Sequence, residues 1–191
     1  KTDHIICATD KSWATERHLV TGERITRPDL IKRLTTGTPP TLIAELASTD
    51  ADDTATAIPL VVGTVEVTVA DAVGEPVDTS NGGDSDALNE AHSAQLPPSS
   101  CTYGLIGLLA VDPAYQSCRI GSSLVRAAEE YARSRLNLSH AGVWVINRRT
   151  DIIQWYERMG FTWTGRELPF IWAHLLLDDT VRFRIYLKPL A

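Results

Sequence analysis

The chain has 191 residues, of which 43% are hydrophobic and 22% charged, and these values are typical of one globular domain with a sizeable core. No run of 18 or more apolar residues occurs and the N-terminus lacks a secretory signal, so we expect no membrane-spanning helix and no membrane partner. Three cysteines without paired spacing predict neither a disulfide framework nor a metal site, and they favour the reducing cytoplasm.

Charge is divided unevenly along the chain. Residues 1–33 carry seven basic and five acidic side chains, residues 34–118 no basic and twelve acidic ones, and residues 119–191 eleven basic and seven acidic ones. The acidic middle argues against a nucleic-acid partner, which requires a contiguous basic surface. The basic final third suits a small phosphate-bearing molecule, although acids that only keep the central loops soluble explain the same pattern.

The first half of the chain predicts one helix and two strands. The tripeptide Arg-Pro-Asp at 27–29 is typical of a helix start, and Gly37 ends the helical pattern. Residues 41–48 and 59–70 are rich in aliphatic and β-branched side chains, and we expect them to pair antiparallel. Residues 71–100 carry six acids and no Lys or Arg, and they predict a mobile acidic insertion.

The second half predicts alternating strands and helices. Residues 103–111 and 141–147 are apolar throughout, so we expect central strands that helices cover on both faces. Further helices and strands are predicted at residues 121–136, 150–160, 161–164 and 181–187, with a long loop at 166–179. This order indicates a mixed sheet with helices on its faces.

The turn after the 103–111 strand is a candidate anion site. Residues 116–123 are small or amide-bearing, contain no acid, and lie where a helix begins. Backbone N–H groups at a helix N-terminus favour a bound anion. The alternative is an ordinary connection between a strand and a helix.

Two motifs, 40 residues apart from Gln116 to Tyr156, carry a family resemblance. The stretch Val111-Asp112-Pro113 followed by Gln116-x-x-Arg119-x-Gly121 resembles motif A of the GNAT N-acetyltransferase superfamily, a strand end, an (Arg/Gln)-x-x-Gly-x-(Gly/Ala) turn and a helix start. The run Tyr156-Glu157-Arg158-Met159-Gly160-Phe161 resembles the end of its motif B. Residues 12–16 and 181–190 resemble the flanks of small fungal-type members that act on small molecules.

This resemblance implies a single GNAT domain over residues 1–191, an α/β (mixed α+β) fold. Its central, mostly antiparallel mixed sheet has a splayed central strand pair and helices on both faces, with Gly107 at the irregularity. The resemblance also implies acetyl-CoA as cofactor, bound by Leu109, Ala110, Val111, Gln116, Ser117, Cys118, Arg119, Ile120, Gly121, Ser122 and Tyr156. Arg119 stands where the family usually has its first glycine, and it either crowds the pyrophosphate or lends it a positive charge.

The same resemblance assigns acid catalysis to Tyr156. The residue matches the family's general acid, which protonates the departing CoA thiolate, whereas an aromatic on an apolar helical stripe is otherwise a core residue. The residue that acts as general base is not identified, because the 103–110 strand contains no acid. Glu16, Glu45 and Glu66 are candidates that contact the substrate or its proton, and a surface position is the alternative for each.

The acceptor is less defined. Trp13, Phe170 and Trp172 either close a partly hydrophobic acceptor pocket or seal the edge of the core or a dimer interface. We predict acetyl transfer from acetyl-CoA to a primary amine of a small molecule, by direct attack in a ternary complex, in a monomer or homodimer. A non-catalytic acyl-CoA-binding protein and a protein or peptide N-acetyltransferase are the alternatives.

Overall fold

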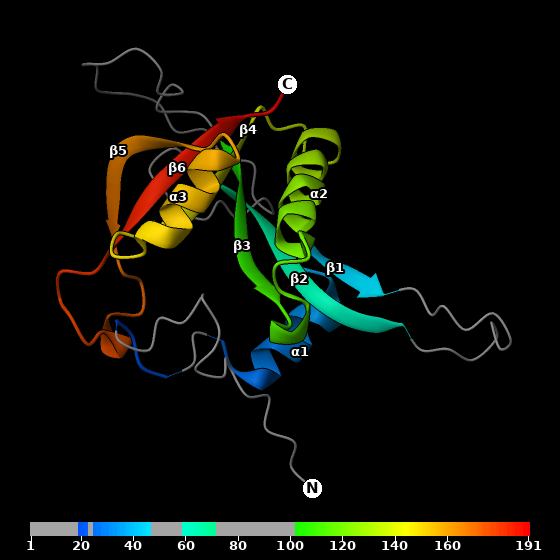
Figure 1. The fold of residues 1–191 in the computed structure, drawn as a ribbon, viewed down its shortest axis with the longest axis horizontal. Helices are drawn as coiled ribbons and strands as arrows, with labels where there is room; N and C mark the ends of the chain where they lie inside the picture. The colour runs from blue at the N-terminus through cyan, green and yellow to red at the C-terminus, as the bar shows by residue number, and fades with distance from the viewer. Residues whose placement is uncertain (1–18, 23–24, 47–58, 72–101) are drawn as a thin grey trace, which may run out of the picture.

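The computed structural model describes residues 19–22, 25–46, 59–71 and 102–191 (Figure 1). Trp13, Glu16 and almost all of the predicted 71–100 insertion lie outside these residues. The elements in chain order are α1 (Arg27–Thr36), β1 (Thr41–Leu46), β2 (Leu60–Ala70), β3 (Tyr103–Val111), the 3₁₀ turn η1 (Pro113–Tyr115), α2 (Ile120–Ser134), β4 (His140–Ile146), α3 (Thr150–Arg158), β5 (Thr162–Pro169), η2 (Ala173–Leu175) and β6 (Arg182–Pro189).

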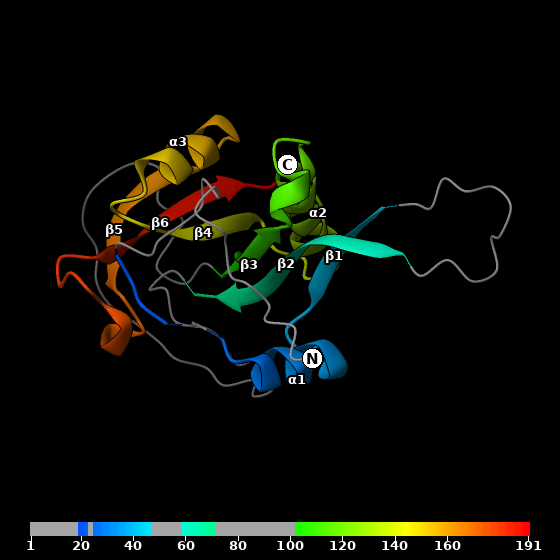
Figure 2. The same ribbon diagram turned by 60° about the horizontal axis from the view of Figure 1, so that its bottom comes forward.

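The strands form one mixed sheet in the order β1-β2-β3-β4-β6-β5. Every neighbouring pair is antiparallel except β3 and β4, which are parallel. Helices α2 and α3 lie over one face of the sheet and α1 lies over the other, as Figure 2 shows. The structure therefore confirms the predicted mixed sheet with helices on both faces. None of the helices in the described residues is long and apolar enough to cross a membrane.

The helix α1 begins and ends where the sequence predicts. The hydroxyl of Thr26 accepts a hydrogen bond from the Asp29 N–H, and a proline occupies the first turn. Gly37 adopts the left-handed conformation (φ 64°) and closes the last turn through its N–H, which donates to the Arg33 carbonyl oxygen. Both signals are local, so they could be recognised without the rest of the fold.

The central strands β3 and β4 separate soon after they meet. In the described chain they pair only at Gly104↔Ala141 and Leu105↔Gly142, and β3 then continues to Val111 without β4 beside it. The β2–β3 register shifts at the same level, where Leu108 takes a positive φ of 44°. The splayed central pair is thus confirmed. The irregularity lies at Leu108, one residue beyond the predicted Gly107, because the extra residue of a bulge bends the strand that carries it.

Two elements differ from the sequence prediction. The predicted 161–164 strand is in fact β5, which runs to Pro169 through a bulge with Gly165 at φ 79°. The predicted loop from residue 166 is therefore shorter, because β5 resumes pairing with β6 after the bulge. The prediction that helices cover all of the 103–111 strand is also wrong, since Leu108 is 39% exposed where β4 has diverged.

Each face of the sheet carries its own apolar cluster. The face under α2 and α3 buries Val65, Val67, Ile106, Leu124, Val125, Ala128, Val143, Val145 and Tyr156. On the opposite face Trp144 packs in two further clusters, and its indole Nε1–H donates to the hydroxyl of Tyr103 at 2.9 Å. The sheet is therefore anchored on both sides of the point where β3 and β4 separate.

Gly104 permits the close approach of α2 to β3. A Cβ at this position would lie 2.6 Å from the Cβ of Ala132, which no side chain tolerates without movement of the helix or the strand. We expect Gly104→Ala to lower the free energy of unfolding by about 1–3 kcal/mol through overpacking.

Gly107→Ala, on the same strand, is the matched control for this prediction. In the described part of the chain, a Cβ at Gly107 would have no atom within 4 Å, so we expect a change within about 0.5 kcal/mol. Urea denaturation measures both variants. Equal stability of the two would contradict the proposed close approach.

Candidate functional site

The turn between β3 and α2 presents backbone N–H groups to solvent. The Asp112 carboxylate accepts a hydrogen bond from the Ala114 N–H at 2.8 Å and begins η1, and the Gln116 amide donates to the Val111 carbonyl oxygen at 3.1 Å. Helix α2 then starts without a side chain that caps its first turn. The predicted segment 116–122 therefore consists of a turn at 116–119 and the first three residues of α2, which suits a phosphate group.

Arg119 adopts a left-handed conformation at the start of α2, with φ 65° and ψ 5°. This conformation favours glycine, the residue usual here in the family that the motif resembles, and it costs an L-residue about 1–2 kcal/mol. Ser117 also has a φ of 65°. The Arg119 side chain is exposed, and within the described residues no ion pair holds it. Its charge is therefore available beside the N-terminus of α2.

The backbone of β3 offers polar groups to the side that β4 has left. The Asp112 N–H donates to the Val62 carbonyl oxygen at 2.8 Å, so Asp112 turns its N–H toward β2. Because alternate residues of a strand turn their backbone groups to opposite sides, Ala110 also faces β2, whereas Leu109 and Val111 face the gap. Of the three predicted strand residues, Leu109 and Val111 are thus the ones placed to bind a ligand through the backbone.

Tyr156 lies in the core under α3 with 7% of its surface exposed. Its ring packs edge-on against Trp155 and Phe161, with centroids 4.8 and 5.4 Å away. The hydroxyl makes no hydrogen bond within the part of the chain that the structure describes, and burial raises the pKa of this phenol far above its ordinary value. Tyr156 is therefore a neutral buried donor without an acceptor among the described residues. Buried donors in folded proteins normally have an acceptor, so a bound ligand is expected to supply it.

Trp155 joins the two motifs in space. Its indole ring and the Val111 side chain both lie 3.7 Å from the position that a Cβ of Gly121 would take. The helix α3, the N-terminus of α2 and the end of β3 therefore meet at one place. The uncapped turn at the start of α2 lies at this place, and Tyr156 packs against Trp155 in the adjoining core, so the site fits a ligand with a phosphate end and a less polar end.

Glu66 is a buried carboxylate on the opposite face of the sheet. It is 4% exposed, and the Arg33 guanidinium of α1 donates to it at 2.8 Å. Burial raises the pKa of Glu66, while the hydrogen bond and charge of Arg33 act in the other direction. Glu45, by contrast, is exposed on the edge strand β1.

Phe170 is part of the core. It is 3% exposed and packs against Phe183 and Trp172, with ring centroids 5.0 and 5.6 Å away. Leu19 and Val20 complete this apolar cluster. The sequence predicts that Phe170 either closes an acceptor pocket or seals the edge of the core or a dimer interface. Its surroundings match a position at the edge of the core.

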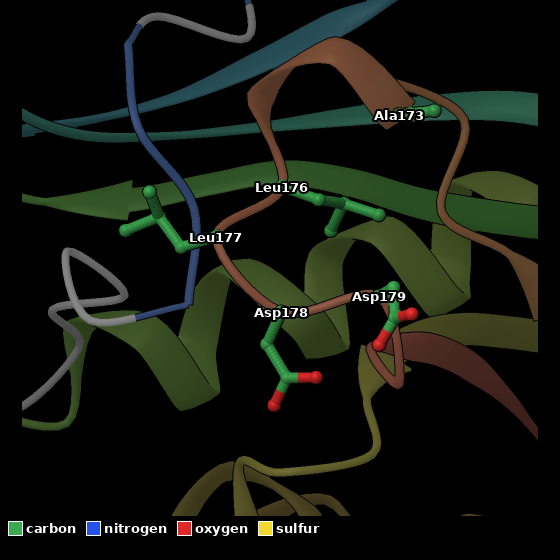
Figure 3. Close-up of a pocket in the computed structure, with 5 residues that line it drawn as sticks. All are labelled: Ala173, Leu176, Leu177, Asp178 and Asp179. Atoms are coloured by element: carbon green, nitrogen blue, oxygen red, sulfur yellow. The ribbon is translucent and has the colours of Figure 1, made fainter.

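The segment after η2 borders a shallow hollow of about 840 Å³, shown in Figure 3. Its lining residues are Ala173, Leu176, Leu177, Asp178 and Asp179. The carboxylate of Asp178 accepts hydrogen bonds from the N–H and hydroxyl of Thr180, which lower its pKa, and Arg148 lies 3.4 Å away. The hollow is therefore bordered by acidic residues, and the Asp178 carboxylate hydrogen-bonds within its own loop.

Sequence reasoning missed three residues of these surroundings. Arg33 gave no signal, because its contact with Glu66 joins residues 33 positions apart. Arg149 is 4% exposed and holds Asp151 through two hydrogen bonds, which lower the pKa of that carboxyl. Trp155 stands beside Tyr156 in the sequence, yet only the structure shows that it contacts the N-terminus of α2.

Comparisons with known proteins address the family. A model of the acetyltransferase (GNAT) family matches residues 60–161. No curated protein sequence matches the chain.

Solved structures share the fold at low identity. The NatC complex bound to Gag peptide and CoA is 17% identical, with 90% of this chain and 84% of that chain covered and a TM-score of 0.53. A GNAT-family acetyltransferase from Streptococcus pneumoniae is 16% identical, with 89% and 80% covered and a TM-score of 0.51. A spermidine N-acetyltransferase SpeG chimera from Vibrio cholerae and hSSAT is 12% identical, with 86% and 77% covered and a TM-score of 0.52.

The matched residues 60–161 span more than half of the chain and include β2, β3, α2, β4 and α3. They thus contain both the turn at the start of α2 and the buried Tyr156. The protein belongs to the GNAT acetyltransferase family and is an acetyl-CoA-dependent N-acetyltransferase.

Proposed function

We propose that the protein transfers an acetyl group from acetyl-CoA to a primary amine of a small molecule, by direct attack in a ternary complex. The observation that carries this proposal is the separation of β3 from β4, on a sheet whose α2–α3 face carries the uncapped N-terminus of α2 and the buried Tyr156. Placing amine and thioester together in such a gap supplies much of the rate enhancement, up to about 7–11 kcal/mol.

The chain's own backbone groups hold the cofactor in this proposal. The N–H groups of residues 116–122 and the positive end of the α2 dipole bind its phosphates. The backbones of Leu109 and Val111 hydrogen-bond its pantetheine arm, which takes the place that β4 would have beside β3. An N–H of one of these two residues polarises the thioester carbonyl. Bound acetyl-CoA supplies the acetyl group as a thioester, which amines attack readily.

Tyr156 is the proposed proton donor to the CoA sulfur. Its pKa is raised by burial, so the phenol stays protonated throughout the physiological range and can donate. Its hydroxyl has no competing acceptor in the described chain, and a sulfur atom that enters the gap would provide one.

The pairing of the 175–177 segment with residues 19–21 supports a small acceptor. The Thr21 N–H donates to the Leu175 carbonyl oxygen at 2.8 Å, and the Leu177 N–H donates to that of Leu19 at 3.0 Å. An extended peptide commonly binds by pairing with a free backbone edge. Here the 175–177 segment is already paired with the 19–21 segment, and the aromatic cluster around Phe170 fills the space behind it.

A peptide N-terminus is the second candidate acceptor. The hollow in Figure 3 is open and carries Asp178 and Asp179 on its border, which favours a basic peptide that lies across it. This candidate needs the peptide to bind mainly through side chains, because the loop backbone is paired.

Thiol release from acetyl-CoA tests the function with two sets of acceptors. One set contains amino acids, polyamines and aminoglycosides, and the other contains peptides with free N-termini or lysines. We expect release with members of the small-amine set at kcat/KM values at least 100-fold above those of any peptide. Faster release with peptides would overturn the small-molecule assignment, and tight CoA binding without release in either set would overturn the activity.

Tyr156→Phe removes the proposed proton donor and keeps the packing of the ring. We expect kcat to fall about 100-fold or more, which is the usual contribution of a general acid. Because the hydroxyl has no partner in the described chain, stability and CoA affinity are expected to change little. Steady-state kinetics, thermal melting and calorimetric CoA binding measure the three quantities. Tyr131→Phe, a half-buried tyrosine of α2, is the control, and wild-type kcat in Tyr156→Phe would rule out the donor role.

Arg119→Gln removes the charge beside the pyrophosphate turn. We expect CoA to bind about two- to fivefold more weakly at low salt, the range for an exposed ion pair, and the difference to shrink near 1 M salt as screening increases. Arg126→Gln, two turns further along α2, is the control. Tighter CoA binding in Arg119→Gln would show instead that the side chain crowds the phosphates.

A further inference from the structure

We infer that Glu66, oriented by Arg33, is the carboxylate that binds the acceptor's ammonium group and removes its proton. This inference rests on the proposed function, and it assigns the general base that the central strand β3 lacks. It also defines the acceptor as an amine that carries a positive charge when it binds.

The position of Glu66 follows from the register of the sheet. Glu66 of β2 stands directly opposite Gly107 of β3, and such cross-strand partners project from the same face. This is the face opposite α2, because a Cβ at Gly104, three positions before Gly107, would strike Ala132 of α2. The carboxylate therefore lies one residue from the Leu108 bulge, on the face that carries Arg33 and Trp144.

The position across the strand pair from Glu66 has room for a small group. Among the described residues, a Cβ at Gly107 would meet no atom within 4 Å, whereas Cβ atoms at Gly63, Gly104 and Gly142 would all meet neighbours closer than 3.0 Å. The missing side chain at 107 leaves room next to Glu66 for a small group such as an ammonium ion. This room borders the gap between β3 and β4, into which the thioester is proposed to extend from the other face.

The charge surroundings of Glu66 suit a base. Its cross-strand neighbours, Thr41 of β1 and Gly107 of β3, carry no charge, and among the residues that the structure describes Arg33 of α1 is the charged group that acts on it. A buried carboxylate binds a proton more tightly than an exposed one, and Arg33 keeps enough of it ionised to accept one. Arg33 is 41% exposed and touches no proposed reacting atom, so it is a positioning residue.

The protons balance in this assignment. Glu66 takes one proton from the ammonium group and later releases it to solvent, which leaves a neutral amine with a free electron pair. The C–N bond forms as the C–S bond breaks, and the electron pair of that bond stays on sulfur. Tyr156 gives its proton to the sulfur, and the second proton lost by the nitrogen restores the phenol.

The test compares Glu66→Gln with Glu45→Gln, a matched change on the exposed edge strand β1. With any small amine that the wild type acetylates, we expect Glu66→Gln to lower kcat/KM about 100-fold or more at pH 7. The deficit should shrink as the pH approaches the pKa of the amine, because the neutral amine then forms without a base. Glu45→Gln should retain the wild-type rate.

The pH profile separates catalysis from structure. In the wild type, kcat/KM should rise with pH through a limb displaced above the usual carboxyl range, and Glu66→Gln should lack this limb. Arg33→Gln should move the limb to higher pH, because Arg33 lowers the pKa of Glu66, and Arg33→Lys should restore it in part. Thermal melting and CoA binding of each variant verify folding.

The outcomes distinguish the two claims. A wild-type pH profile in folded Glu66→Gln would overturn the role of Glu66 and leave the acetyl transfer intact. A wild type that binds CoA and acetylates no amine would overturn the proposed function itself, and with it this inference.

Discussion

The separation of β3 from β4 is the constraint on which the rest of this structure depends. Two parallel strands that pair at only two positions leave backbone N–H and C=O groups on the β4 side of β3 without a strand partner in the described chain. Such groups need another partner, and a gap lined by them is stable only if water or a ligand can enter. The bulge at Leu108 and the close fit of Gly104 against α2 hold β3 in this arrangement.

In the proposed reaction, the groups that act on the cofactor and those that act on the amine lie on opposite faces of the sheet. One face carries the uncapped N-terminus of α2 and the buried phenol of Tyr156 on α3. On the other face, Glu66 and Arg33 lie beside the open position at Gly107. Because the two substrates reach the gap from opposite faces in this scheme, neither has to leave before the other binds, which is what direct transfer in a ternary complex requires.

The order of the elements followed from local signals. Thr26, the Arg-Pro-Asp start and Gly37 define α1 by capping chemistry, and the apolar run at 103–111 defines β3 to the residue. The prediction failed where pairing decides the outcome. Gly165 interrupts β5 without ending it, because β6 is available to pair with the strand beyond the bulge. The prediction that helices cover all of β3 failed for the same reason, because the position of β4 leaves Leu108 exposed.

The sequence by itself determined the family, because motifs A and B lie at fixed spacing within continuous segments, and the same motifs predict the cofactor turn and the acid. Only the tertiary structure decided the environment of each residue. Nothing in the sequence distinguishes Glu66 from Glu45, yet one is buried on an Arg33 guanidinium and the other is exposed at a sheet edge. Phe170 likewise joined the core through contacts with residues far along the chain. Burial and charge pairing arise from packing between distant segments, and these two effects set the proton affinity of a side chain.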